Sequence, residues 1–250
     1  MISVCMATYN GERFIKQQID SILCQLNSED ELIISDDGST DGTLEIIQSY
    51  NDKRIKVLNH HHDSYLESMK RSRNYYFATS NFENALKNAK GDYIFLSDQD
   101  DLWKVNKVKL YLQYLNCHKF VVANYSVIDS DNKIILQQRY YKNPISKTIF
   151  KNMIFNNLMG CTMAFRREVL NMALPFPRRL IAHDFWLGCL FCKDIFYIPE
   201  CLLLYRRYGR NVSSTLGVSN NPIWYRLQYR FILYLQILKR KKEFRKFQRK

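Results

Sequence analysis

The strongest constraint on the fold is a repeated order of short apolar runs and amphipathic segments in the first 101 residues. The runs are short enough for buried strands, and the segments between them repeat apolar residues at helical spacing. The runs lie at residues 2–7, 32–34, 55–58 and 93–96, and the helical segments at 14–26, 44–47 and 80–89. Strands alternating with helices predict an α/β fold with a mostly parallel, Rossmann-like sheet and helices on both faces.

Local signals place the boundaries of these elements. Asn10-Gly11 predicts a turn after the first strand, and a Ser80-Asn-Phe-Glu83 capping box predicts the start of the third helix. The rest of the chain is more mixed. It predicts helices at 105–115, 149–158, 167–174 and 185–192, a hairpin of 120–128 with 133–138, and strands within 195–205. We find no repeat or low-complexity linker and expect one domain, 1–222, followed by a tail, 223–250.

The net charge of +13 is unevenly distributed. Residues 1–101 carry more acidic than basic side chains, whereas 102–222 and 223–250 are both strongly basic. A protein that coats nucleic acid would not need an acidic first part. Nucleic-acid binding therefore stays only as an alternative, without an aromatic and basic recognition motif to support it.

The cysteines and the apolar runs bear on the compartment. No run reaches the roughly 20 residues that cross a bilayer, and the first residues do not resemble a signal peptide. The seven cysteines are odd in number and scattered, so we expect reduced thiols in a cytosolic protein. Cys189-x-x-Cys192 lies in an apolar segment and indicates core more than a metal or redox site. His60-His61-His62 is interpreted as a loop.

Polar clusters directly follow three of the predicted strands: Thr8-Tyr9-Asn10, Asp36-Asp37 and Asp98 to Asp101. Because parallel strands end at one edge of a sheet, the clusters should converge there. The carboxylates of Asp98, Asp100 and Asp101 repel one another unless a cation is present, and Mg²⁺ or Mn²⁺ prefers such oxygen ligands. The alternatives are a helix N-terminus for the third cluster and an ordinary turn for Asp36-Asp37.

Two further clusters lie in the second half of the chain. His183-Asp184 precedes an apolar helix, where Asp184 could act as a general base or the pair could simply cap the helix. Residues 205–211 contain Arg206, Arg207 and Arg210. Guanidinium groups suit phosphates, and the alternative is a solvated basic loop.

Together these segments resemble a known family. Residues 1–22 (MISVCMATYNGERFIKQQIDSI) and 31–43 (ELIISDDGSTDGT) resemble the start of a family 2 glycosyltransferase with a GT-A fold. Residues 81–103 are similar to the metal-binding segment of its bacterial polysaccharide branch, often labelled rhamnosyltransferase-like. Residues 160–168, 182–187 and 205–215 resemble the acceptor-side motifs of that branch in the same order. The resemblance covers roughly residues 1–215.

The resemblance implies an inverting enzyme that moves a sugar from dTDP-rhamnose or a UDP-hexose to a lipid-linked glycan. This acceptor belongs to bacterial O-antigen or capsule synthesis at the inner face of the cell membrane. The implied halves are 1–101 for nucleotide and metal and 102–222 for the acceptor. The implied roles are nucleotide binding by Thr8, Tyr9, Asp36, Asp37 and Asp98, Mg²⁺ or Mn²⁺ binding by Asp98 and Asp100, general base catalysis by Asp184 beside His183, and diphosphate binding by Arg206 or Arg207.

The chain departs from this family at Tyr208, where members often carry histidine. A neutral tyrosine is a poor metal ligand, so the resemblance leaves Arg207 or Arg210 to act in that loop. A catalytically inactive member that serves as a binding partner is the alternative to the enzyme.

The tail repeats large apolar residues at three- and four-residue spacing among many cations. The apolar positions are Trp224, Leu227, Phe231, Tyr234, Leu235 and Leu238, and the basic ones Arg226, Arg230 and 239–242. This pattern is typical of an amphipathic helix that binds an anionic membrane surface. The alternative is a helix that packs on the domain or on a second subunit.

Overall fold

The computed structural model describes residues 1–61, 68, 72–155, 157–178, 180–209 and 221–248. The strands are β1 (Ile2–Thr8), β2 (Glu31–Asp36), β3 (Ile55–Asn59), β4 (Tyr93–Asp98), β5 (Leu102–Trp103), β6 (Phe120–Ile128), β7 (Ile134–Leu136), β8 (Met163–Arg166) and β9 (Ile195–Arg206). The α-helices are α1 (Ile15–Leu23), α2 (Thr43–Gln48), α4 (Arg73–Asn88), α5 (Lys107–Leu115), α6 (Ile149–Ile154), α7 (Glu168–Ala173), α8 (His183–Leu190) and α9 (Ile223–Phe247).

All the strands belong to one sheet in the order β3-β2-β1-β4-β8-β6-β9-β5. Strand β7 pairs with the last residues of β6, Val127 and Ile128. The first four strands are parallel, and β1 lies between β2 and β4. In this register Thr8 pairs with Asp36 and Ala7 pairs with Asp98. The predicted convergence of the three polar clusters at one edge is therefore confirmed.

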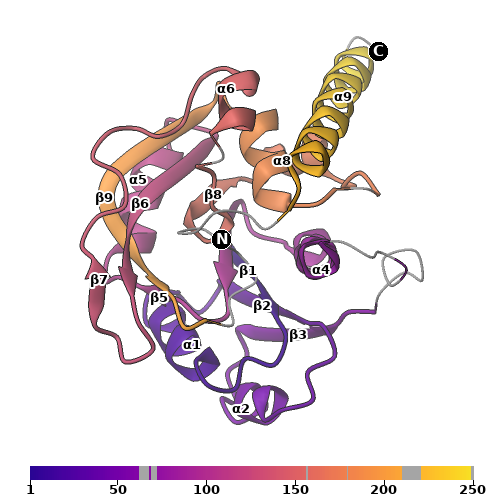
Figure 1. Cartoon of the computed structure of the whole chain (residues 1–250). Helices are drawn as coiled ribbons and strands as arrows, with labels where there is room; N and C mark the ends of the chain where they lie inside the picture. The colour runs from indigo at the N-terminus through magenta and orange to yellow at the C-terminus, as the bar shows by residue number, and fades with distance from the viewer. Residues whose placement is uncertain (62–67, 69–71, 156, 179, 210–220, 249–250) are drawn as a thin grey trace.

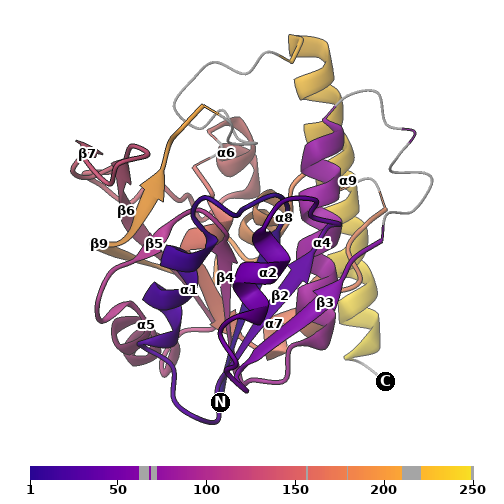
Figure 2. The same ribbon diagram turned by 90° about the horizontal axis from the view of Figure 1, so that it is seen from below.

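Helices cover both faces of the sheet (Figures 1 and 2). Alternate residues of a strand point to opposite faces, so Val4 and Met6 pack in one core with α1 and α5, while Cys5 packs in another with α4 and α8. The predicted α/β architecture is confirmed. Cys189 and Cys192 are buried, and all seven cysteines are free thiols.

The start of α4 differs from the prediction. The helix begins at Arg73, so Ser80 lies inside it and donates its hydroxyl to the Phe77 carbonyl. Tyr76, Thr79 and Phe82 are buried at three-residue spacing, which extends the sheet-facing side of the helix back beyond the capping-box signal. The capping-box prediction was wrong because packing against the sheet outweighs the local signal.

The other elements lie close to their predicted positions. The hairpin of β6 and β7 is present, while α6 ends earlier than predicted and α8 begins earlier. The chain also forms two short strands that the sequence did not predict. Of these, β8 lies antiparallel between β4 and β6, and β5 pairs with β9.

The tail forms the long helix α9, of which one side packs on the domain. Leu233 and Ile237 are buried in the core that α4 and α8 share, and Arg240 donates to the carbonyls of Met172 and Pro175. A second side is exposed and apolar. Its residues, called the apolar stripe below, are Ile223, Trp224, Leu227, Phe231, Tyr234, Leu235 and Leu238. No helix among the described residues combines the length and apolar character needed to cross a membrane.

Candidate active site

A cavity of about 1280 Å³ lies at the edge where β1, β2 and β4 end. Residues from all three strand-end clusters line it, together with the first residues of α8. The predicted site residues that line the cavity are Thr8, Tyr9, Asp37, Asp98, Asp100, His183 and Asp184. Asp36, Arg206 and Arg207 are not among its lining residues.

The loop after β1 is tied to the loop after β4 by Gln99. The Thr8 hydroxyl and the Tyr9 N–H (2.8 Å) both donate to Gln99 Oε1, and Gln99 Nε2 donates to the Tyr9 carbonyl at 3.0 Å. Tyr9 itself is 54% exposed on the cavity wall. Gln99 was not predicted as a site residue, although its position between Asp98 and Asp100 indicates that it lies at the site.

Asp36 and Asp37 have different positions. The Asp36 carboxylate accepts the N–H groups of Gly38 and Ser39 and the Ser39 hydroxyl, so it shapes the turn after β2. Gly38 has φ +79°, a conformation that glycine adopts without strain. Asp37 lines the cavity, and its Oδ1 lies 2.7 Å from His60 Nδ1.

His60 lies in the loop after β3, as predicted, and this loop is at the same edge of the sheet as the polar clusters. Asn59 pairs with Asp36 across β2 and β3, and the His60 N–H donates to the Asp36 carbonyl at 2.7 Å. Its position directly after a strand of the parallel sheet was the signal that could have identified it. His62, two residues further along, lies outside the described residues.

The carboxyl groups of Asp98 and Asp100 create the acidic part of the cavity. Burial, reinforced by the nearby charges of Asp100 and Asp184, raises the pKa of Asp98 to about 7. Burial also raises the pKa of Asp100, against hydrogen bonding and nearby arginines that lower it. A divalent cation would relieve this repulsion, and two carboxylates on an accessible wall fit Mg²⁺ or Mn²⁺.

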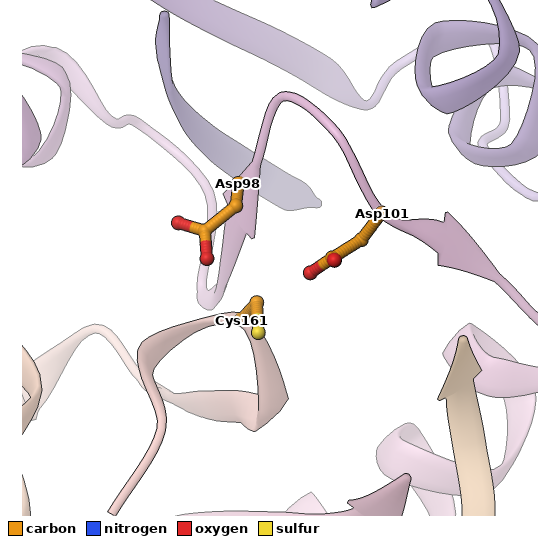
Figure 3. Close-up of side chains that lie close together, drawn as sticks. All are labelled: Asp98, Asp101 and Cys161. Atoms are coloured by element: carbon orange, nitrogen blue, oxygen red, sulfur yellow. The ribbon is translucent and has the colours of Figure 1, made fainter. Parts of the chain in front are cut away.

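Asp101 lies behind the cavity wall with Cys161. Figure 3 shows Asp101 reaching toward Asp98 and Cys161, and the possible ligand atoms of these three residues lie within 4.8 Å of one another. Burial raises the pKa of the Cys161 thiol well above its usual value, so it stays protonated and does not suit a hard cation. Asp101 Oδ1 accepts the Arg206 N–H at 3.0 Å, which identifies it as support for the loop.

Lys107 is a third buried residue behind the acidic loop, next to Asp101 and Cys161. Its ammonium donates to the Cys161 carbonyl at 3.0 Å and lies 4.1 Å from the centre of the Trp103 ring. Burial lowers the pKa of Lys107 to about 8, while the charges of Asp101 and Asp98 oppose that shift. A buried cation thus faces the buried side of the acidic loop.

Arg206 also supports this loop from behind. The side chain is fully buried, and its guanidinium donates to the Asp100 carbonyl (2.8 Å), Asn132 Oδ1 (2.6 Å) and Gln17 Oε1 (3.0 Å). These protein acceptors bind the guanidinium N–H groups of Arg206 that the resemblance would direct to a diphosphate. Arg207 is partly exposed, and its charge lowers the pKa of Asp100. Arg210 lies outside the described residues.

Tyr208 lines the cavity and is hydrogen bonded to Asp100. Its ring lies edge-on to Phe14, with 4.8 Å between the ring centres. Burial and the charge of Asp100 raise the pKa of Tyr208 far above its usual value, so the phenol stays neutral and its O–H donates a hydrogen bond to the carboxylate. Tyr208 therefore hydrogen bonds to Asp100 and adds no anionic ligand of its own.

Asp184 lies in the first turn of α8, with Ala182 at the N-cap position. Its carboxylate accepts the Phe185 N–H at 2.6 Å and the Gly160 N–H. It is thus fixed within the first turn of the helix, two residues beyond the N-cap position. Burial raises the pKa of Asp184 to about 6, which makes it a stronger base than an exposed aspartate and leaves it mostly ionised at neutral pH.

His183 is neutral, since burial lowers its pKa to about 3. Its ring packs 4.0 Å from Phe82, and its Nε2 is buried with no hydrogen-bond partner in the described part of the chain. A Cβ on Gly160 would lie 2.5 Å from that nitrogen. Gly160 therefore leaves room for His183 while its N–H holds Asp184.

Known proteins resemble the chain over most of its length. The family described as "Glycosyl transferase family 2" matches residues 3–172. The chain is 30% identical over 247 residues to the putative teichuronic acid biosynthesis glycosyltransferase TuaG of Bacillus subtilis, covering 96% of this chain and 91% of TuaG. It is 29% identical to the Escherichia coli UDP-Glc:alpha-D-GlcNAc-diphosphoundecaprenol beta-1,3-glucosyltransferase WfgD, covering 78% of this chain and 70% of WfgD.

A solved structure shares the fold of the chain. The chain matches S. aureus TarS 1–349 in complex with UDP-GlcNAc with a TM-score of 0.66 at 19% identity. The match covers 94% of this chain and 66% of the length of that chain. The chain therefore belongs to glycosyl transferase family 2, with the GT-A fold, and is a glycosyltransferase.

Proposed function

We propose that the protein is a metal-dependent, inverting glycosyltransferase that moves a sugar from a nucleotide diphosphate to a lipid-linked glycan. The observation that carries this proposal is a single cavity that contains both an acidic pair suited to Mg²⁺ or Mn²⁺, Asp98 and Asp100, and a buried carboxylate of raised pKa, Asp184. The charge of Asp184 helps to raise the pKa of Asp98, which supports placing the proposed base near the proposed cation site.

Different residues of the chain would bind the donor, hold the cation and take the proton of the acceptor. Tyr9, Asp37 and Gln99 would bind the nucleoside part of the donor, and Asp98 and Asp100 would hold the cation. When bound, that cation supplies positive charge that stabilises the departing diphosphate. Asp184 would take the proton of the acceptor hydroxyl as it attacks the sugar from the opposite side, which inverts the anomeric centre. Arg207 is the arginine we assign to the diphosphate.

The proposed roles assign the two halves of the domain to different substrates. Residues 1–101 would bind nucleotide and metal, and 102–222 would complete the domain on the acceptor side. Relatives suggest the substrates, since the name of WfgD specifies UDP-glucose and a diphosphoundecaprenol-linked acceptor. We propose a UDP-hexose or dTDP-rhamnose donor and an acceptor of bacterial surface polysaccharide synthesis, O-antigen or capsule, at the inner face of the cell membrane.

A nucleotide panel tests this function. Unfolding is followed with UDP, dTDP and GDP, each with and without Mn²⁺, and we expect one nucleotide to raise the unfolding temperature chiefly when Mn²⁺ is present. The matching nucleotide sugars are then supplied with Escherichia coli membrane lipids, and transfer into the lipid fraction is measured. Absence of both stabilisation and transfer would favour the inactive binding protein, and oligonucleotide binding that survives Asp98→Ala would favour the nucleic-acid alternative.

The rate of transfer should depend on pH through Asp184. The base acts as a carboxylate, so protonation below its pKa of about 6 removes the active form. We expect kcat at pH 5 to be about tenfold lower than at pH 8, at saturating donor, acceptor and Mn²⁺. Repeating the profile at a tenfold higher Mn²⁺ concentration is the control. An inflection that moves with Mn²⁺ would assign the profile to metal loss instead of Asp184.

We also propose that α9 binds an anionic membrane through its apolar stripe. The stripe runs along one exposed side of the helix, and five cations follow it besides Arg240, which binds the domain: Lys239, Lys241, Lys242, Arg245 and Lys246. Apolar side chains entering the interface beside cations that attract anionic headgroups are what such a surface requires. The tail would then hold the enzyme next to a lipid-linked acceptor.

Replacing Trp224, Leu227 and Phe231 with serine should weaken binding to vesicles of phosphatidylcholine and phosphatidylglycerol by at least about 100-fold, since each loses apolar burial. The control variant changes Val105 and Tyr141 to serine, which are also strongly exposed but lie outside α9. Co-sedimentation measures binding. Unchanged vesicle binding with conversion of a dimer to a monomer would make the stripe a subunit interface.

A further inference from the structure

A cluster of three arginines lines the cavity at the junction of α4 and α9. Arg73, Arg226 and Arg230, called the arginine cluster below, share this cavity with Asp184. Within the described residues none of the three forms an ion pair. The Nε of Arg230 is buried and has no hydrogen-bond partner there. A buried guanidinium donor without an acceptor, in a cavity that two further arginines also line, favours an anionic ligand.

The two helices bring these arginines together. Residues of α4 and of α9 line the same cavity, and the charge of Glu83 on α4 acts on Arg240 of α9. Arg226 and Arg230 are four residues apart, so they project from the same side of α9. That side continues into the buried Leu233 and Ile237, which pack the helix against the domain. The cluster is therefore held by the fold.

The donor's diphosphate does not need this cluster. In the function proposed above, the cation that Asp98 and Asp100 would hold, together with Arg207 near Asp100, provides for it on the nucleotide side of the cavity. The cavity of about 1280 Å³ also exceeds the roughly 300–1,000 Å³ of a site for one small ligand. A second anionic ligand fits at the α4–α9 side.

The apolar stripe indicates what carries that second anion. It lies roughly 100° around α9 from Arg226 and Arg230, given 3.6 residues per turn. On a helix about 10–12 Å across, the stripe and the arginines are within about 10 Å of each other. With the stripe at a membrane interface, the arginines would lie at the depth of the headgroups, where the diphosphate of a lipid-linked saccharide resides.

We propose that the arginine cluster binds the diphosphate of the lipid-linked acceptor, so that α9 both docks on the membrane and delivers the acceptor to Asp184. This inference rests on the proposed lipid-linked acceptor. It gives Arg73, Arg226 and Arg230 a role distinct from the donor site, and it makes α9 a wall of the active site as well as an anchor.

The test compares neutral phosphatidylcholine vesicles that carry undecaprenyl diphosphate with vesicles that carry undecaprenol. We expect the native chain to bind the diphosphate vesicles at least about tenfold more tightly. In the variant Arg226→Gln/Arg230→Gln the preference should fall to about twofold or less. The control Lys109→Gln/Lys193→Gln removes two charges from exposed residues that do not line the cavity and should keep the preference. If the double variant does not fold, Arg73→Gln replaces it.

Each alternative has its own outcome. A native chain without preference, or an equal loss on phosphatidylglycerol vesicles without diphosphate, would overturn the proposal. A rise in the KM of the nucleotide sugar as large as the loss of vesicle preference would assign the arginines to the donor's diphosphate and also overturn it. A preference for diphosphate in a chain that transfers no sugar would refute the proposed function while leaving the cluster as an anion site.

Discussion

Asp184→Asn is expected to lower kcat for sugar transfer at least about 10³-fold while leaving nucleotide binding intact. Asparagine keeps one oxygen, which can accept the Phe185 N–H as Oδ1 of Asp184 does, so the first turn of α8 should keep its geometry. It cannot take a proton from the acceptor hydroxyl. His183 cannot replace it, because burial keeps its pKa at about 3 and its position is defined by Phe82 and Gly160.

The same substitution should stabilise the fold. The pKa of Asp184 is raised from its ordinary value of 3.8 to about 6, so its ionised form is disfavoured in the folded state. The stability associated with the protonated group is present below pH 4 and is lost as the pH rises through 6. Asp184→Asn should therefore add roughly 1–2 kcal/mol to the free energy of unfolding at pH 8 and little at pH 3.5.

Transfer assays and urea unfolding at both pH values measure these effects. Asp194→Asn is the matched control, because Asp194 is exposed just beyond α8. It should change neither the rate nor the stability appreciably. Native-like transfer by Asp184→Asn would remove Asp184 from the role of base. A loss of transfer accompanied by a loss of stability would mean that the carboxylate is needed for structure.

The edge of the sheet that forms the site could be predicted because strand order and direction follow from local patterns. Apolar runs that alternate with helices require a parallel sheet, and this places the residues after β1, β2 and β4 together. The individual roles could not be read in the same way. Asp36 and Asp37 are adjacent, yet one closes a turn on Gly38 and Ser39 while the other lines the cavity.

Side chains whose partners lie far away in the sequence escaped prediction for a related reason. Arg206 is held by Gln17, Asn132 and the Asp100 carbonyl, three partners that no local spacing relates to it. Its position beside other arginines in the sequence suggested phosphate binding. In the structure Arg206 is buried, and its guanidinium donates to acceptors of the protein instead. The two sides of α9 show the same limit. Its spacing revealed an apolar stripe, but the packing of Leu233 and Ile237 depends on α4 and α8.

Removing the metal site should have the second large effect. Asp100→Asn replaces one of two anionic ligands by a neutral one, so we expect Mn²⁺ affinity to fall at least about 100-fold. Transfer by Asp100→Asn should fall about 10²- to 10⁴-fold at fixed Mn²⁺. Chelation of the metal should lower transfer by the native chain to a similar extent. Excess Mn²⁺ should restore transfer by the native chain but not by the variant. Titration of Mn²⁺ followed by electron paramagnetic resonance gives the affinity without relying on activity.

Tyr208→Phe separates loss of a ligand from loss of loop geometry. It removes the hydrogen bond that Asp100 accepts but keeps the ring against Phe14. Since that hydrogen bond competes with a cation for the carboxylate, the variant should bind Mn²⁺ at least as tightly as the native chain. Equal Mn²⁺ affinity in the native chain and in Asp100→Asn would exclude Asp100 as a ligand. Weakening by Tyr208→Phe as strong as that by Asp100→Asn would show that Tyr208 positions Asp100 for the metal and does not compete with it.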